Sequence, residues 1–278
     1  MQILYGLHPV EEALRAGKRR FDHVLVARER RDERLEAIAQ LCKDLKIRLR
    51  TEPREVLNDI ARTQAHQGVV AFVKAQEFLA IEDVVGPTGE PRLVLALDGV
   101  EDPQNLGALL RSADGAGVDA VVMTERRAAP LSAVAAKAAA GAQEHLRIAR
   151  VVNLVRALEE LKRNNLWVIG LDERGTTDYD QFDFTGDCVL VMGREGEGLH
   201  DLVRRTCDHL LRIPMAGGVS SLNVSAAGAV VLYEAARQRR AKFRSGARGG
   251  DKSGSGASKE GAPRSDVSKA KRQKGLGS

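Results

Sequence analysis

The 278-residue chain contains few cysteines, few aromatic residues and no long apolar run. Its three cysteines, Cys42, Cys188 and Cys207, are odd in number, widely spaced and part of no metal-binding motif. A disulfide framework and a zinc site are therefore not expected, and a reducing cytoplasm fits this cysteine usage. We expect all three to be small buried hydrophobic residues.

Two further absences concern membranes and metals. No stretch approaches the ~18 uninterrupted apolar residues of a transmembrane helix. No basic segment leads into an apolar one at the N-terminus, so no secretory signal is predicted. The six histidines are scattered, at positions 8, 23, 66, 145, 200 and 209. We expect a cytoplasmic protein with neither a membrane partner nor a bound metal.

Charge is present in quantity but unevenly distributed around a net +5. Residues 244–278 hold nine lysines and arginines against three acidic residues, and residues 1–75 hold fifteen against eleven. Residues 76–243 hold nineteen against twenty-four. The basic ends would attract a polyanion such as RNA, while the acidic middle would not. Charge alone leaves RNA binding and simple solubility both open.

The chain divides into four segments. The pattern of residues 1–75 predicts a small α/β unit. Its expected helices lie at 8–16, at 32–45 and from 53, and its expected strands at 23–28, 47–51 and 69–74. Apolar and polar residues alternate at 47–51, which predicts that this strand is half-buried. Glycines and prolines mark 76–91 as a linker. Residues 241–278 have too little apolar surface to fold, which predicts a disordered basic tail, either an RNA-binding arm or a solubilising extension.

Residues 92–240 repeat a strand-then-helix rhythm. The predicted strands are 93–98, 119–123, 166–171, 188–192 and 209–213, and the predicted helices lie near 103–114, 131–140, 152–164, 199–206 and 222–240. The strands are almost continuously apolar, as a parallel sheet covered on both faces requires. The sequence therefore predicts an α/β domain with a parallel sheet.

A first polar motif follows the strand at 93–98. Asp102 is a natural N-cap and Pro103 a natural first-turn residue, so a helix should begin here. Gly107 and Arg111 are four residues apart and share one face of that helix. Ligands bind at the carboxyl ends of strands in open α/β sheets. From these residues alone, Arg111 is either a ligand-binding group or a solvated helical arginine.

A second motif is the glycine-rich loop at 193–198, which lies between a strand and a helix. Its Gly-x-x-Gly-x-Gly spacing differs from the Gly-x-Gly-x-x-Gly of dinucleotide-binding proteins. The carboxylates of Glu195 and Glu197 would also repel a pyrophosphate. The loop thus favours a neutral or cationic ligand, such as the sulfonium of S-adenosylmethionine, and disfavours a nucleotide-binding oxidoreductase.

A third motif covers 213–225, where a strand ends at Pro214 and a Gly-Gly hinge precedes a Ser/Asn cluster. Together, NxGxxxR at 105–111, GxEGxG at 193–198 and IPMxGxxxSLNVSxA at 213–227 resemble the three motifs of the SpoU/TrmH class of SPOUT RNA methyltransferases. YGLHPV at 5–10 and HQGV at 66–69 resemble the substrate-binding domain of the same family. The likeness covers about residues 3–240.

The resemblance implies a fold and a function. The catalytic domain at 92–240 would be an α/β trefoil knot threaded around 193–225, and the N-terminal domain would be an L30e-like unit that presents RNA. The protein would be a homodimer that uses S-adenosylmethionine to methylate a ribose 2′-hydroxyl. Within the family, the chain is most similar to enzymes that methylate a guanosine in 23S ribosomal RNA.

The resemblance also implies site residues. The positions that match family active-site residues are Asn105, Arg111, Glu195, Ser221 and Asn223. The positions that match the cofactor loops are Gly193, Gly198, Ile213, Met215 and Leu222. Arg111 would contact the target phosphate and hydroxyl, with the asparagines and Ser221 positioning the ribose. A role as proton acceptor is a second hypothesis for Arg111, although arginine retains its proton strongly.

The chain departs from the family pattern at two positions. Arg194 stands where a small or apolar residue is common, and Arg147 where proline is common. Because neither is a motif residue, these departures bear on fine specificity and not on activity. Transfer RNA as substrate, and an RNA-binding assembly factor without catalysis, are the alternatives that remain open.

Overall fold

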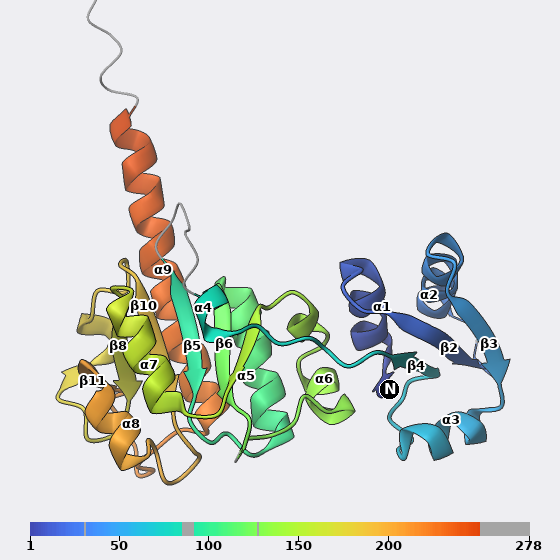
Figure 1. Cartoon of the computed structure of the whole chain (residues 1–278), viewed down its shortest axis with the longest axis horizontal. Helices are drawn as coiled ribbons and strands as arrows, with labels where there is room; N and C mark the ends of the chain where they lie inside the picture. Colours follow the sequence, from blue (N-terminus) through green and yellow to red (C-terminus); the bar gives the residue numbers. More distant parts are fainter. Residues whose placement is uncertain (31, 85–91, 127, 251–278) are drawn as a thin grey trace, which may run out of the picture.

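The computed structural model describes residues 1–30, 32–84, 92–126 and 128–250. Two sheets organise these residues, one in each of two domains that meet near α6 (Ala133–Ala138) (Figure 1). The N-terminal sheet has the order β1-β4-β2-β3, and the larger sheet has the order β7-β6-β5-β10-β8-β11-β9.

The N-terminal domain is a mixed sheet covered by helices on both faces. Its elements are β1 (Gln2–Tyr5), α1 (Leu7–Ala16), β2 (Phe21–Ala27), α2 (Glu33–Asp44), β3 (Arg48–Glu52), α3 (Arg54–Ala61) and β4 (Val69–Val73). β4 pairs antiparallel with β1 and β2, whereas β2 and β3 are parallel. Val69, Ala71 and Val73 pack with α1 and α2, while Val70 packs on the other face with Leu57 of α3.

The strand predicted at 47–51 is present, but the prediction that it is half-buried is wrong. The strand forms, but the side chains of residues 48–51 are all exposed, including Leu49 at 37%. β3 lies at the edge of the sheet and is bonded to β2 on one side. Alternation of apolar and polar residues predicts a strand but does not reveal whether another layer covers it.

The second, larger domain is built on a seven-stranded parallel sheet. Its elements are β5 (Leu93–Leu97), α5 (Pro103–Ala116), β6 (Ala120–Thr124), α6 (Ala133–Ala138), η1 (Ala142–Glu144), β7 (Ile148–Val151), α7 (Leu154–Arg163), β8 (Trp167–Leu171), β9 (Thr177–Asp178), η2 (Tyr179–Gln181), β10 (Cys188–Met192), α8 (Asp201–Thr206), β11 (His209–Arg212) and α9 (Val224–Gly250). All of its strand pairs are parallel.

Both faces of this sheet are buried, which explains the apolar runs. Leu93, Leu95 and Leu97 of β5 join a core with α5 and α9, while Val94 and Ala96 join a second core with α7 and α8. The predicted parallel α/β fold is therefore confirmed. Three short strands, β1, β7 and β9, were not predicted from the sequence. In β7, Arg150 also breaks the run of apolar residues.

The segment predicted as a linker at 76–91 is partly packed. The backbone N of Leu79 donates to the carbonyl of Ile148 at 2.9 Å. α4 (Ile81–Val84) follows, and Val84 is 2% exposed in the core shared with α7. The first half of this segment therefore lies against the seven-stranded sheet, while 85–91 lies outside the described residues.

The C-terminal helix is longer than predicted. α9 continues from Val224 to Gly250, whereas the sequence predicted a helix that ends at 240 and a disordered tail from 241 onward. A helix already anchored by packing extends at little cost through good helix formers such as Ala241 and Lys242. Its end projects beyond the larger domain (Figure 1). Residues 251–278 lie outside the described residues.

Among the described helices, none is both long and apolar enough to cross a membrane.

Candidate active site

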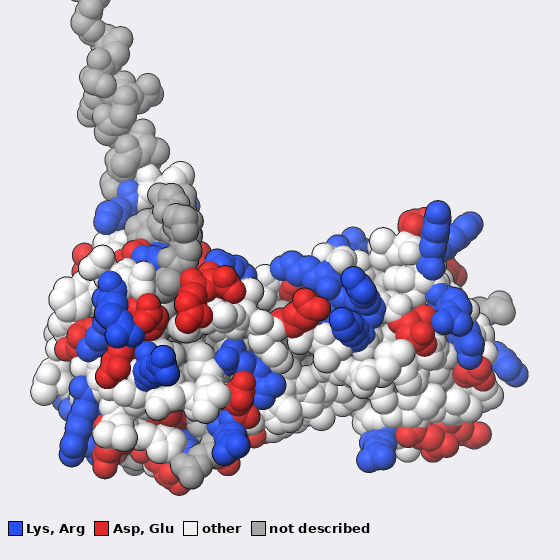
Figure 2. Space-filling model, in the orientation of Figure 1, with Lys and Arg blue, Asp and Glu red and all other residues white. Residues whose placement is uncertain are grey.

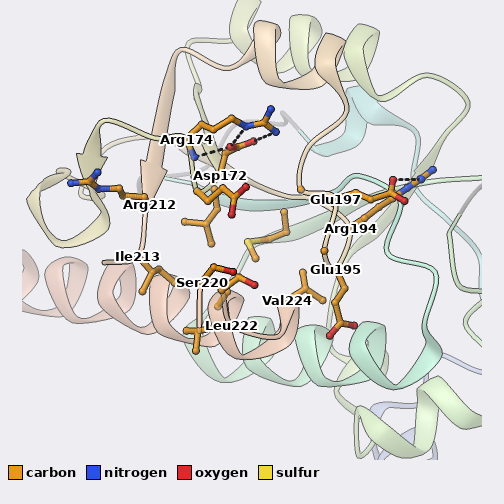
Figure 3. Close-up of a pocket in the computed structure, with 18 of the residues that line it drawn as sticks. Asp172, Arg174, Arg194, Glu195, Glu197, Arg212, Ile213, Ser220, Leu222 and Val224 are labelled. Atoms are coloured by element: carbon orange, nitrogen blue, oxygen red, sulfur yellow. Dashed lines mark hydrogen bonds and ion pairs between the residues drawn. The ribbon is translucent and has the colours of Figure 1, made fainter. Parts of the chain in front are cut away.

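One pocket lies at the carboxyl ends of three parallel strands. The loops that follow β8, β10 and β11 line it, together with the start of α9 (Figure 3). This is the edge at which the sequence predicts ligand binding. All five predicted cofactor residues line the pocket, namely Gly193, Gly198, Ile213, Met215 and Leu222.

The glycine-rich loop after β10 is a closed turn. The backbone N of Arg194 donates to the carbonyl of Gly198 at 2.9 Å, and the N of Gly198 donates back to the carbonyl of Arg194 at 3.1 Å. Gly196 and Gly198 have φ of +78° and +72°, which a side chain would strain. A Cβ on Gly193 would lie 2.3 Å from the carbonyl oxygen of Gly198. The turn therefore requires glycine at Gly193 for a close approach of two backbone segments.

A buried carboxylate holds this loop to β5. Asp98, which directly follows β5 and is 4% exposed, accepts the backbone N of His200 at 2.8 Å and contacts the Nδ1 of the same residue at 2.9 Å. Arg194 pairs with Glu197 at 2.8 Å within the turn (Figure 3). Asp98 was not predicted as a functional residue, although a carboxylate at the last position of the apolar strand predicted at 93–98 was a usable signal.

Three of the predicted catalytic residues meet in one hydrogen-bonded triad. The Nδ2 of Asn105, at the start of α5, donates to the Oε2 of Glu195 at 2.8 Å. The Nδ2 of Asn223 lies 3.0 Å from both the Oδ1 of Asn105 and the Oε1 of Glu195. Two amides thus fix the orientation of the carboxylate, and each member comes from a different sequence motif.

Ser225 belongs to the same cluster and was not predicted. Its hydroxyl donates to the Oδ1 of Asn223 at 2.6 Å, and its backbone N donates to the same oxygen at 2.9 Å. These bonds hold the Asn223 amide with its Nδ2 toward Glu195. The Ser-x-x-Asn-x-Ser pattern at the start of a helix was the available signal, because serine and asparagine bond to backbone at such positions.

Ser221 and Arg111 stand apart from this triad. Ser221 lines the pocket from the loop after β11. Arg111 is exposed on α5, does not line the pocket and makes no hydrogen bond or ion pair with any described residue. Gly107, on the same helical face, is packed against α6, where a Cβ would lie 2.4 Å from that of Ala138. Within one chain, the structure therefore does not bring Arg111 to the other predicted residues.

The pocket wall combines apolar and acidic groups. Its apolar part includes Leu171, Met192, Ile213, Leu222 and Val224. Four carboxylates and three guanidinium groups also line it, namely Asp172, Glu173, Glu195 and Glu197 with Arg174, Arg194 and Arg212. Arg174 is paired with Asp172 at 2.9 Å (Figure 3). An apolar wall suits an adenine ring, and carboxylates suit a positive charge. These residues fit S-adenosylmethionine better than an anionic dinucleotide.

The cysteines take no part in this site. Burial raises the pKa of Cys188 to about 11 and that of Cys207 to about 12, so neither thiol ionises at neutral pH. Cys42 and Cys188 are buried, as predicted, while Cys207 is only partly buried. In the part of the chain that the structure describes, no cluster of three or more His, Cys, Asp or Glu side chains could hold a metal ion.

The comparisons with known proteins identify the class. Residues 92–233 match the model of the SpoU rRNA Methylase family, and residues 3–79 match the model named RNA 2'-O ribose methyltransferase substrate binding. The chain therefore belongs to the SpoU rRNA methylase family.

Particular relatives are similar over nearly their whole length. The 23S rRNA (guanosine-2'-O-)-methyltransferase RlmB of Photobacterium profundum is 43% identical, covering 85% of this chain and 98% of the relative. The RlmB of Pseudomonas syringae is 41% identical, covering 87% and 98%. Among solved structures, the SpoU methyltransferase AviRb of Streptomyces viridochromogenes in complex with AdoMet has a TM-score of 0.73 at 26% identity, covering 86% and 90%. An AdoMet-bound rRNA methyltransferase of Sinorhizobium meliloti has a TM-score of 0.70 at 28% identity, covering 85% and 87%.

Proposed function

We propose that this protein transfers a methyl group from S-adenosylmethionine to the ribose 2′-hydroxyl of a guanosine in 23S ribosomal RNA. The observation that carries the proposal is the triad of Asn105, Glu195 and Asn223 at the rim of a pocket suited to a cationic cofactor. The two RlmB relatives described above are each matched along 98% of their length, and their names state this activity.

The chain's own residues would act in two groups. The backbone and apolar side chains at Gly193, Gly198, Ile213, Met215 and Leu222 would bind the adenosine part of the cofactor. S-adenosylmethionine, when bound, supplies a methyl group on a positively charged sulfur. Because the leaving group is already cationic, the reaction needs no metal to stabilise its departure.

The polar residues would prepare the ribose. The 2′-hydroxyl is a poor nucleophile unless its proton is removed or its developing charge is stabilised. Asn105, Asn223 and Ser221 would position the ribose, and Asn105 and Asn223 also hold the Glu195 carboxylate in one orientation. Arg111 would contact the target phosphate and the hydroxyl as a fixed positive charge.

The position of Arg111 supports a homodimer. Arg111 is exposed and does not line the pocket formed by its own chain. Near the pocket and along α9, Val219, Leu222 and Tyr233 are also exposed, at 67%, 38% and 48%. A second copy that covers this apolar surface could bring an arginine to each site. We therefore propose that the active site is completed across a subunit interface.

RNA would be bound mainly by the N-terminal domain. Residues 1–75 carry a net positive charge, while 76–243 carry a net negative one. On the face shown in Figure 2, lysine and arginine side chains gather over α1 and around α2 and β3. Such a basic folded domain suits recognition of RNA shape and phosphates.

The decisive test is mapping of ribose methylation in total RNA from cells with and without this protein. The expected result is the loss of one methylated guanosine in 23S RNA. Restoration by the wild-type gene, and none by a Glu195→Ala variant, would assign the chemistry to this site. Loss of a methyl group from transfer RNA instead would change the substrate, and an unchanged methylation map with altered ribosome assembly would indicate a non-catalytic factor.

A further inference from the structure

A buried ion pair joins the two domains. Arg19, in the turn between α1 and β2, forms a two-pronged contact with Glu144 of η1 in the catalytic domain. Its Nε lies 2.8 Å from the Oε2 of Glu144, and its Nη2 lies 2.8 Å from the Oε1. The two side chains are 3% and 2% exposed. Charged side chains so fully removed from water are uncommon and require complete pairing.

The surrounding polar groups complete this pairing from both domains. Arg19 donates to the Oε1 of Gln2 at 2.8 Å and to the Oε1 of Gln76 at 3.0 Å. Gln143 donates to Glu144 at 3.1 Å, and its carbonyl accepts from Gln76 at 3.2 Å. Residues of the N-terminal domain, of the segment that follows it and of the catalytic domain therefore meet around one guanidinium group.

The junction is continuous with α5, the helix that carries Asn105 and Arg111. α6 and η1 pack on α5, where the contact at Gly107 is so close that a Cβ would lie 2.5 Å from the carbonyl oxygen of Ala135. On the other side of α6, Ala136 is buried in the core of the N-terminal domain. Lys137 donates to the carbonyl of Ala65 at 3.0 Å. A single layer of packed structure thus separates α5 from the substrate-binding domain.

A buried bidentate pair constrains orientation more than it stabilises. A guanidinium fork and a carboxylate satisfy each other in few geometries, and rotation of one domain would leave both charges buried and unpaired. Replacing such a pair by apolar residues often preserves stability but removes its two directional hydrogen bonds. Relative motion is the default for two domains whose interface is not large and hydrophobic.

We propose that Arg19 and Glu144 are positioning residues that fix the RNA-binding domain at one orientation relative to the active site. The separation between the RNA segment held by the N-terminal domain and the ribose that is methylated is then set by the fold. This inference rests on the proposed function for its consequence in catalysis, but the orientation itself can be measured without RNA.

The test compares the full-length wild type with Arg19→Leu/Glu144→Leu, which removes both charges together. Glu11→Gln/Arg15→Gln is the matched control, because that pair lies within α1, crosses no domain boundary and leaves Arg15 55% exposed. Backbone residual dipolar couplings report the relative orientation of the two domains. We expect one orientation in the wild type and the control, and averaged couplings in the leucine variant.

Catalysis provides the second measurement. With 23S RNA, kcat/KM of the leucine variant should fall between about tenfold and a hundredfold, because a displacement of about 1 Å can cost that much. Methylation should also spread to neighbouring nucleotides, while calorimetry shows unchanged binding of S-adenosylmethionine. Arg19→Lys keeps the positive charge but cannot form the two-pronged contact with Glu144. Its kcat/KM should therefore lie between those of the wild type and the leucine variant, and it can be measured even if the leucine variant does not fold.

The outcomes separate this inference from the proposed function. A leucine variant with wild-type couplings, and an Arg19→Lys variant with wild-type kcat/KM and methylation pattern, would overturn the positioning role. A wild type that methylates no RNA would overturn the proposed function, and the couplings would still decide whether the ion pair fixes the domains.

Discussion

At the scale of single residues, Arg111 is the predicted catalytic residue that belongs neither to the triad nor to the pocket lining of its own chain. We predict that Arg111→Ala lowers kcat for methyl transfer by at least about a hundredfold, as removal of one charge-stabilising donor does in other enzymes. Affinity for S-adenosylmethionine, measured by calorimetry, should stay unchanged because Arg111 does not line the pocket.

Arg156→Ala is a suitable control for this measurement. Arg156 is also an exposed helical arginine, but it lies on α7, which packs on the opposite face of the sheet. Its replacement should leave methyl transfer at the wild-type rate. Equal turnover in the wild type and the Arg111→Ala variant would show that the assigned role is wrong.

His66 is a second residue with a measurable consequence. It is fully buried, its Nε2 lies 2.9 Å from the Oδ1 of Asn58, and its Nδ1 accepts the backbone N of Gly68 at 3.1 Å. Burial, and then the positive charges of Arg54 and Arg30, lower the pKa of His66 below its usual value of 6.5. The ring is therefore neutral in the folded protein, with its proton on Nε2.

This lowered pKa predicts a pH dependence of stability. Below about pH 6.5 the unfolded chain binds a proton at His66 that the folded chain does not. The contribution of neutral His66 to stability is thus fully present above pH 6.5 and is lost as the pH falls below that value. Urea unfolding at pH 7.5 and 5.5 should show a smaller pH effect in His66→Gln than in the wild type. The same pH effect in both proteins would contradict the prediction.

At the scale of elements, the turn after β10 depends on a close backbone approach. A Cβ at position 193 would lie 2.3 Å from the carbonyl carbon and oxygen of Gly198, and no flexible side chain can yield there. We predict that Gly193→Ala opens the turn and weakens binding of S-adenosylmethionine by about tenfold or more in calorimetry. The seven-stranded sheet should remain folded, because the turn lies outside it.

Gly186→Ala is the matched control for that substitution. A Cβ at this position would meet no described atom within 4 Å. Cofactor affinity should therefore equal that of the wild type. If the two alanine variants bound the cofactor equally well, the close approach at Gly193 would have no bearing on the pocket.

At the scale of the whole molecule, charge is separated between the ends and the middle of the chain. Residues 244–278 carry nine basic and three acidic residues, and α9 makes its described contacts before residue 244, the last being Lys242 with Thr185 at 3.2 Å. Deleting 244–278 should therefore weaken RNA binding without unfolding the catalytic domain.

The salt dependence of binding measures this effect directly. Each lost phosphate contact should reduce the slope of log K against log salt by about 0.7 to 0.9. The methylated nucleotide and the affinity for S-adenosylmethionine should not change. An identical salt slope with and without 244–278 would mean that this basic segment makes no phosphate contacts.

Much of the fold follows from local pattern. Continuous apolar runs such as 93–97 and 188–192 predicted buried parallel strands, because both faces of the sheet are covered. Asp102 and Pro103 predicted the start of α5, and the Asp102 side chain does accept the backbone N of Gln104. Short strands such as β7 and β9 were missed, since a few residues carry too little periodicity to distinguish a strand from a loop.

The sequence by itself determined the chemistry of the site, because the three motifs place Asn105, Glu195 and Asn223 at the carboxyl ends of strands or the start of helices. Only the tertiary structure decided which of these side chains meet, since contacts across 90 and 118 residues depend on how strands order in the sheet. It also placed Arg111 away from its own pocket. The pairing of Arg19 with Glu144 across 125 residues likewise has no local signature, because an ion pair between domains leaves no periodicity in either one.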